Sequence, residues 1–178
     1  MRLIGLAISG TTLGLLLLGG ILLGQADANQ KVFAEDAFRV ALPKDWTGGL
    51  TTDKERWSYQ SRDQGEQLTV SILGVTKPMG TEQRSAAFKK IVALRHDVET
   101  KMPDGPKGVK VTDPSFAEKG GILASRYGGS DAAGRQFRCL LLGGSRAITI
   151  FYFESIQLNA SAADARARAI FNSITVPN

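Results

Sequence analysis

Apolar and polar residues alternate along several short segments of the chain, and this period of two is typical of β-strands. The first strand is predicted at residues 38–42, where every second residue is apolar and Pro43 follows. Two more are predicted at residues 56–60 and 67–75, and the loop between them contains the Asp and Gly that turns favour. Residues 29–37, which precede the first strand, are interpreted as a short polar lead-in.

Four further strands are predicted in the second half of the chain, at residues 109–113, 122–128, 135–143 and 147–153. The turns between them are short and rich in glycine, so these strands should be antiparallel neighbours. The strand at 135–143 has two apolar faces, with Phe137, Cys139 and Leu141 on one face and Leu140 and Leu142 on the other. A strand of this kind needs cover on both sides of the sheet.

Two helices are predicted, and both carry apolar residues at helical spacing. The first begins at Thr81, after a proline and a glycine that break the chain, and ends before the turn at residues 103–108. Its apolar stripe comprises Phe88, Ile91, Val92, Leu94, Val98 and Met102. The second begins with Ser161 and Asp164 as a capping pair. Its apolar stripe comprises Ala163, Ala167, Ile170, Phe171 and Ile174.

These elements predict one α+β domain, residues 38–178, in which an antiparallel β-sheet is sandwiched between helices. The body of the chain, about 150 residues, has the size of a single domain. The sequence contains no internal repeat, low-complexity tract or long linker that would mark a second domain.

The N-terminal segment has the pattern of an export signal. Arg2 supplies a positive start, residues 13–23 form an apolar core, and Ala26 and Ala28 are small residues at the two positions that a signal peptidase recognises. Residues 1–28 are therefore predicted to be a signal peptide that is cut after Ala28, which gives a periplasmic or secreted protein. An uncleaved anchor is the alternative, because residues 3–24 are uncharged and could cross a hydrocarbon core of roughly 30 Å.

Charge and cysteine content narrow the classes of partner. The formal net charge is +5, and a basic balance suggests nucleic acid, a phosphate surface or an acidic partner. Export argues against nucleic acid, and the basic residues are spread out with no run longer than Lys89-Lys90. The single cysteine, Cys139, excludes an intramolecular disulfide, and the signal segment has no cysteine for a lipoprotein anchor.

The order of the elements carries a family resemblance. A strand leads into a proline and a tryptophan (FRVALPKDW), a hairpin and a long helix follow, and the final helix ends in IFNSITVP. This order resembles the PsbP-like fold family over residues 38–177. The resemblance implies an α/β/α sandwich and an accessory, chaperone-like or partner-binding role. The family has no common catalytic motif, so no functional residue is transferred to this chain.

The residues themselves offer little catalytic chemistry. One histidine and one cysteine cannot build a zinc or copper cluster within one chain, and neither acidic loop matches the EF-hand pattern. His96 is predicted on the helix face opposite Ile91 and Val98, where it would point to solvent and lack a preorganised pocket. We therefore expect no enzyme activity, no catalytic residue, no cofactor and no bound metal.

Two residues are candidates for an interaction site. Arg95 falls within the apolar stripe of the first helix, so its guanidinium must find a carboxylate, extend to the edge of the stripe, or recognise an anion in a cleft. Trp46 either closes one end of the core or stays exposed beside Lys44 as an anchor for a protein partner.

The predicted function is that of an exported, non-catalytic accessory or partner-binding protein of the cell envelope. The expected partner is another envelope protein and not nucleic acid, with membrane contact only if the N-terminal segment is retained. Two alternatives stay open: an immunity-type inhibitor of an envelope toxin, and a carrier of a small anionic or lipidic ligand.

Overall fold

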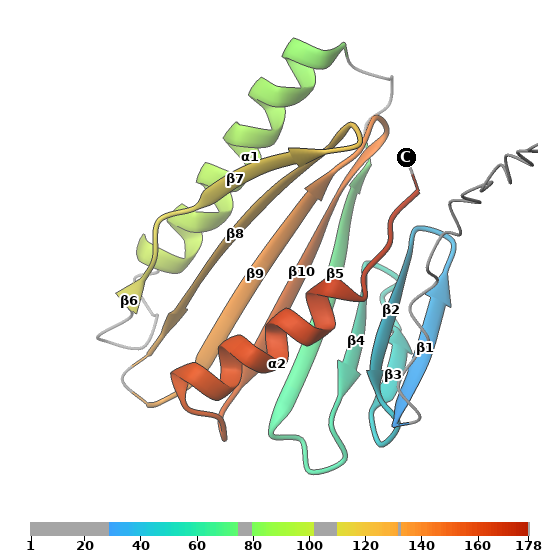
Figure 1. Ribbon diagram of the computed structural model, residues 1–178, viewed down its shortest axis with the longest axis vertical. Coiled ribbons are helices and arrows are strands. Elements are labelled where there is room, and N and C mark those ends of the chain that lie inside the picture. The colour runs from blue at the N-terminus through green and yellow to red at the C-terminus, as the bar shows by residue number, and fades with distance from the viewer. Residues whose placement is uncertain (1–28, 75–79, 102–109, 132, 178) are drawn as a thin grey trace, which may run out of the picture.

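The computed structural model describes residues 29–74, 80–101, 110–131 and 133–177 (Figure 1). The predicted signal peptide with its cleavage site after Ala28 lies outside the described residues. The turn predicted at residues 103–108 lies outside them as well. Of the two helices in the described ranges, neither is long and apolar enough to cross a membrane.

The centre of the molecule is an antiparallel sheet of eight strands. In spatial order its strands are β3 (Thr47–Leu50), β4 (Arg56–Gln60), β5 (Glu66–Gly74), β10 (Ala147–Ser155), β9 (Gln136–Gly143), β8 (Ile122–Ser130) and β6 (Lys110–Val111), and β7 (Ser115–Lys119) also pairs with β8. The predicted antiparallel pairing of neighbouring strands is confirmed for β8 with β9 and for β9 with β10. The sequence did not predict β3 or β7, and β6 is shorter than the predicted strand at 109–113.

The interpretation of residues 29–37 as a lead-in is wrong, because they contain strand β1 (Gln30–Glu35). It pairs with β2 (Phe38–Pro43) over its whole length and forms a separate two-stranded sheet. The side chain of Phe33 packs on Tyr59, with ring centroids 4.6 Å apart. Pairing with β2 and packing on Tyr59 therefore stabilise β1 as a strand, although its apolar and polar residues do not alternate.

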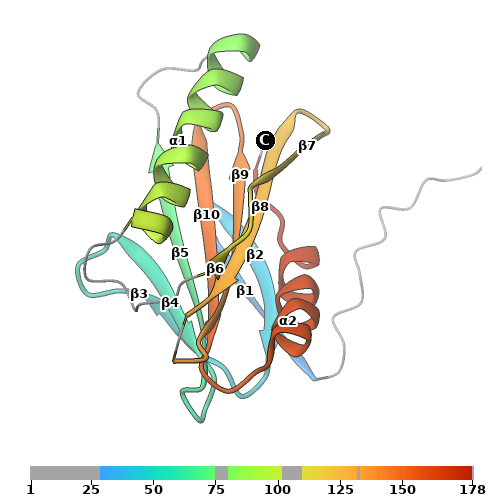
Figure 2. The same cartoon turned by 90° about the vertical axis from the view of Figure 1, so that its left-hand side faces the viewer.

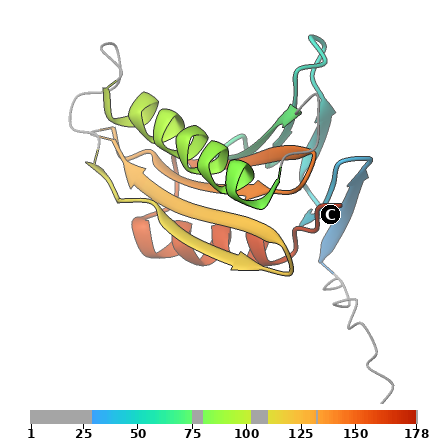
Figure 3. The same cartoon turned by 90° about the horizontal axis from the view of Figure 1, so that it is seen from above.

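Helices α1 (Thr81–Lys101) and α2 (Ala160–Asn172) lie on opposite faces of the main sheet (Figures 2 and 3). Each helix contributes to a separate core. The core on the α2 side includes Leu68, Val70, Leu140, Phe151, Phe153, Ala163, Ala167, Ile170 and Phe171. The core on the α1 side includes Phe88, Val92, Leu123, Tyr127, Phe137, Cys139, Leu141 and Ile148. The predicted division of β9 into two apolar faces is confirmed, since alternate residues of this strand enter different cores.

The apolar stripe predicted for α1 is only partly correct. Phe88 and Val92 are buried, whereas Leu94 and Val98 are 53% and 44% exposed. The helix contacts β6, β8 and β9 along a narrow line, so residues on its flank stay outside the core. Arg95 lies on the side of the helix that contacts the sheet, at a position where a regular apolar stripe would have a hydrophobic residue.

The predicted stripe of α2 is confirmed for Ala163, Ala167, Ile170 and Phe171, which are all buried. Ile174, the last predicted residue of the stripe, lies beyond the end of the helix and is partly buried against the same core. The predicted capping pair, Ser161 and Asp164, is wrong. The N-cap is Asn159, whose side-chain oxygen accepts a hydrogen bond of 2.9 Å from the backbone N–H of Ala162. Asparagine is as good an N-cap as serine, so the helix begins two residues earlier than predicted.

Candidate functional site

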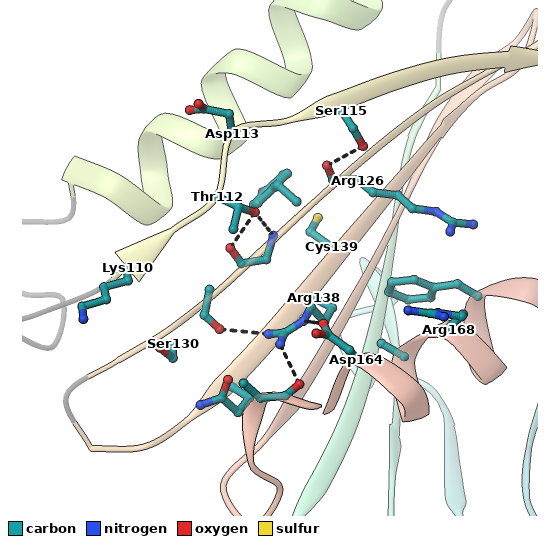
Figure 4. Close-up of a pocket in the computed structure, with 17 residues that line it drawn as sticks. Lys110, Thr112, Asp113, Ser115, Arg126, Ser130, Arg138, Cys139, Asp164 and Arg168 are labelled. Carbon is teal, nitrogen blue, oxygen red and sulfur yellow. Dashed lines mark hydrogen bonds and ion pairs between the residues drawn. The ribbon is translucent and has the colours of Figure 1, made fainter. Parts of the chain in front are cut away.

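A groove of about 520 Å³ lies between α2 and the edge of the main sheet formed by β6, β8 and β9 (Figure 4). Its volume is in the range of clefts that bind ligands. Basic side chains from four elements line it: Lys110 from β6, Arg126 from β8, Arg138 from β9 and Arg168 from α2. Two carboxylates also line it, Asp113 and Asp164, so the cations outnumber the acids by two to one.

Arg138 forms the floor of the groove and ties the sheet to α2. Its Nη1 donates hydrogen bonds to the backbone carbonyls of Gly129 and Phe137, at 3.1 and 2.6 Å. Its Nη2 donates to the carbonyl of Ala160 at 3.1 Å, and its Nε donates to the Asp164 carboxylate. The guanidinium therefore has its donors satisfied and serves as a structural part of the groove.

Gly128 allows Arg138 to lie across the sheet. A Cβ at position 128 would stand 2.5 Å from Cδ of Arg138 and 2.9 Å from the carbonyl oxygen of Phe137, closer than van der Waals contact permits. The edge at this point is closed by Thr112, whose hydroxyl donates to the Gly128 carbonyl at 3.1 Å and accepts from its N–H at 3.0 Å. The absence of a side chain at Gly128 thus leaves this part of the floor to the Arg138 side chain.

The other three cations are exposed and carry uncompensated charge. Lys110, Arg126 and Arg168 form no ion pair with any carboxylate in the part of the chain that the structure describes. Figure 4 shows Arg126 and Arg168 extending from the facing elements β8 and α2. Asp164 is engaged by Arg138, and Figure 4 shows the Asp113 carboxylate directed to the α1 side, away from Arg126. The groove therefore presents a net positive field to solvent.

Trp46, one of the two residues singled out from the sequence, lies in the core. Its side chain is 2% exposed and belongs to the core on the α2 side. The interpretation that it closes the core is confirmed, and the alternative of an exposed anchor for a partner is wrong. The Pro43 carbonyl accepts a hydrogen bond of 3.0 Å from the Trp46 backbone N–H, which turns the side chain inward.

Arg95, the second candidate, is paired within the molecule. Its Nη2 lies 3.0 Å from Oε1 of Glu99, one helical turn away, and its guanidinium carbon lies 5.2 Å from the ring centroid of Tyr152. The Tyr152 hydroxyl donates to the other oxygen of Glu99 at 3.3 Å. The Glu99 side chain is only 8% exposed, so Arg95 neutralises a buried carboxylate. Arg95 does not line the groove.

His96 does not face solvent as predicted, because it lies on the sheet side of α1. Its Nε2 is 3.2 Å from the carbonyl oxygen of Thr112, and its ring meets the Tyr127 ring edge to face at 5.4 Å. Beneath it Cys139 is fully buried, and desolvation raises the pKa of the Cys139 thiol to about 12. The thiol therefore stays protonated at neutral pH, which makes it unreactive.

Among the described residues, no group of three or more His, Cys, Asp or Glu side chains is placed to hold a metal ion. The sequence did contain one signal for the groove, which is Arg138. It lies in a strand that is otherwise apolar on both faces, on the same face as Leu140 and Leu142. A charged residue at such a position requires partners, but only the fold shows that they come from α2.

The described elements form a small α+β domain, and the chain has the PsbP-like fold. It is similar to the solution structure of cyanobacterial PsbP (CyanoP) from Synechocystis sp. PCC 6803, with a TM-score of 0.63, 11% identity, and coverage of 86% of this chain and 96% of that one. It is also similar to LpqN of Mycobacterium tuberculosis, a protein involved in cell envelope biogenesis. The TM-score is 0.51 at 14% identity, with 83% of this chain and 91% of that one covered. No family model matches the sequence, and no curated protein matches it.

Proposed function

We propose that this protein is an exported, non-catalytic accessory protein of the cell envelope that acts by binding another envelope protein. The observation that carries the proposal is the cationic groove beside α2. Three of its basic side chains have no carboxylate partner among the described residues, and charges of one sign in one groove do not stabilise an isolated domain. Such a site is suited to an acidic binding partner.

The fold supports the same class of function by analogy. We take the arrangement of α1, the main sheet and α2 as the α/β/α sandwich of PsbP-like proteins, which offers a rigid platform for a binding surface. LpqN, which has this fold, is described as involved in cell envelope biogenesis. The export signal predicted at residues 1–28 would place this chain in the same compartment as envelope partners.

The absence of enzyme activity is part of the proposal. The two side chains with the best nucleophile or base chemistry are not available: Cys139 lines the groove but is fully buried with a raised pKa, and His96, outside the groove, contacts the Thr112 carbonyl. Neither lies next to an acid or base in the groove that could complete a catalytic pair.

A pull-down with three forms of the chain from residue 29 tests the proposal. The forms are the unmodified chain, Arg126→Glu/Arg168→Glu, and the control Lys89→Glu/Lys90→Glu, which has the same change of charge on the exposed side of α1. We expect one stoichiometric envelope protein to be retained through a moderate salt wash by the unmodified chain and the control. The groove variant should lose it, and a toxin-like partner would single out an immunity role.

Retention of nothing by any form, or of the same proteins by all three, would contradict the proposal. A co-purifying small molecule in place of a protein would assign the groove to a ligand carrier. The control is informative because Lys89 and Lys90 are exposed on the helix that packs on the other face of the sheet.

A further inference from the structure

The groove carries information on the chemistry of its partner beyond the sign of its charge, because the free cations stand at two separate places. Lys110 of β6 is paired in register with Ser130 at one end of β8. Arg126 lies on the same face of β8, four residues away, and Arg168 lies across from it on α2. At about 3.3 Å per residue, the Cα positions of Arg126 and of Ser130, the residue beside Lys110, are about 13 Å apart along β8.

Between the two ends the lining is small and electrically neutral. Gly128 comes from β8, and Ala160 and Ala167 come from α2. The charged pair in this region, Arg138 and Asp164, is internally compensated. The small side chains of Ala160 and Ala167 leave room for a ligand along the α2 wall, whereas Gly128 on the facing wall lies beneath the Arg138 side chain.

We infer that this groove binds an extended acidic segment of the partner protein, with two carboxylates at positions i and i+4. In an extended chain these positions are about 13 Å apart and on the same side, because side chains alternate with a period of two. One carboxylate meets Arg126 and Arg168, and the other meets Lys110. The guanidinium fork of an arginine matches a carboxylate, so the end with two arginines is the stronger of the two contacts. The inference rests on the proposed partner-binding function and specifies what the partner presents.

A single compact anion fits this distribution less well, since it can contact only one of the two ends. Inorganic phosphate should therefore bind weakly and should displace a peptide only at high concentration. A flat anionic membrane should bind weakly as well, because a flat surface cannot reach the floor of a groove.

Titration of the isotope-labelled chain from residue 29 with short acetylated and amidated peptides, followed by NMR, tests the inference. The peptide GETVTEG has the two acids at i and i+4, GETETVG has them at i and i+2, and GQTVTQG has none. We expect GETVTEG to shift the amide signals of Arg126, Gly128 and Gly129. GETETVG should bind about 5-fold more weakly, and GQTVTQG should cause no saturable shift. Raising the ionic strength should weaken the binding of GETVTEG.

Variants give the matched controls. Arg126→Glu/Arg168→Glu should weaken the binding of GETVTEG at least 10-fold, and Lys89→Glu/Lys90→Glu should change it less than 2-fold. Asp164→Asn should strengthen it about 2- to 3-fold, because it removes the carboxylate that compensates Arg138. An increase in affinity cannot result from a variant that fails to fold.

Three results would overturn the inference: no binding of GETVTEG, equal binding of both acidic peptides, or binding that the groove variant does not weaken. Inorganic phosphate that competes as well as the peptide would assign the site to a compact anion. Vesicles of phosphatidylglycerol that retain the chain through Arg126 and Arg168 would assign it to a membrane. If the charge reversal abolishes capture of the pull-down partner while the peptide fails to bind, the proposed function stands and the acidic-segment inference is wrong. If the peptide binds but no partner is captured, the proposed function fails alone.

Discussion

Replacement of Arg138 by methionine tests whether this side chain holds the sheet and α2 together. The guanidinium is 15% exposed and donates to four acceptors. Methionine keeps most of the apolar stem that crosses Gly128, so the variant removes the hydrogen bonds and the charge while it preserves much of the packing.

The expected loss follows from where the four acceptors lie. The bonds to Gly129 and Phe137 are partly buried, and each contributes about 1 kcal/mol. The bonds to Ala160 and Asp164 are exposed, so water replaces the guanidinium and each contributes between about 0 and 1 kcal/mol. The free energy of unfolding should therefore fall by about 2–3 kcal/mol, which lowers Tm by about 5–10 °C for a domain of this size.

Urea denaturation followed by circular dichroism measures the change, with Asp164→Asn as the control. The Asp164 side chain is 55% exposed, so its removal should cost less than about 1 kcal/mol. The reasoning is refuted if Arg138→Met costs less than about 1 kcal/mol. It is also refuted if Asp164→Asn costs as much as Arg138→Met, because the ion pair and not the carbonyl contacts would then carry the stabilisation.

Three further predictions concern stability away from the groove. Arg95→Met should lower the free energy of unfolding by about 2 kcal/mol in urea melts, because it leaves the buried Glu99 carboxylate without a cation. The double variant with Glu99→Gln should recover part of the loss. An Arg95→Met variant with unchanged stability would contradict this prediction. Trp46→Ala should lower the free energy of unfolding by about 3–5 kcal/mol in the same assay, because removal of a side chain that is only 2% exposed leaves a large cavity. A loss below about 1 kcal/mol would show that the core collapses to fill the cavity. Burial raises the pKa of Glu66 despite its pairing with Arg166, so the native state holds this proton more tightly than the unfolded chain does. The stability contributed by this proton is lost as pH rises above about 4.3. The free energy of unfolding of Glu66→Gln, relative to that of the unmodified chain, should therefore increase between about pH 4 and about pH 7. A difference that stays constant or falls over this range would refute the raised pKa.

The local pattern of apolar residues was sufficient to predict an element wherever the burial of that element sets the spacing of its own apolar residues. The strand at 56–60 matches β4, and the alternation in 135–143 assigned each residue of β9 to the correct core. The stripe of α2 was predicted correctly for the same reason. In each case one face of the element is buried along its length, so the period of apolar residues records the packing directly.

Pattern failed where an element is held by pairing and not by its own burial. β7 is exposed at every position and is a strand only because it pairs with β8. β3 contains two glycines, and Gly48 has a φ of +144°. Gly48 also lies so close to β4 that a Cβ at this position would clash with the Ser58 carbonyl oxygen. Neither segment has strand propensity that could have predicted it.

The sequence by itself determined the α+β class, the two-sided sheet and the position of both helices. It could do so because these features depend on residues close together in the chain. Only the tertiary structure decided that Trp46 is buried, that Arg95 is paired with Glu99, and that the cations of β6, β8 and α2 surround one groove. Residues 110 and 168 line the same groove because antiparallel pairing and helix packing bring distant segments of the chain together. The spacing of residues along the chain does not record that proximity.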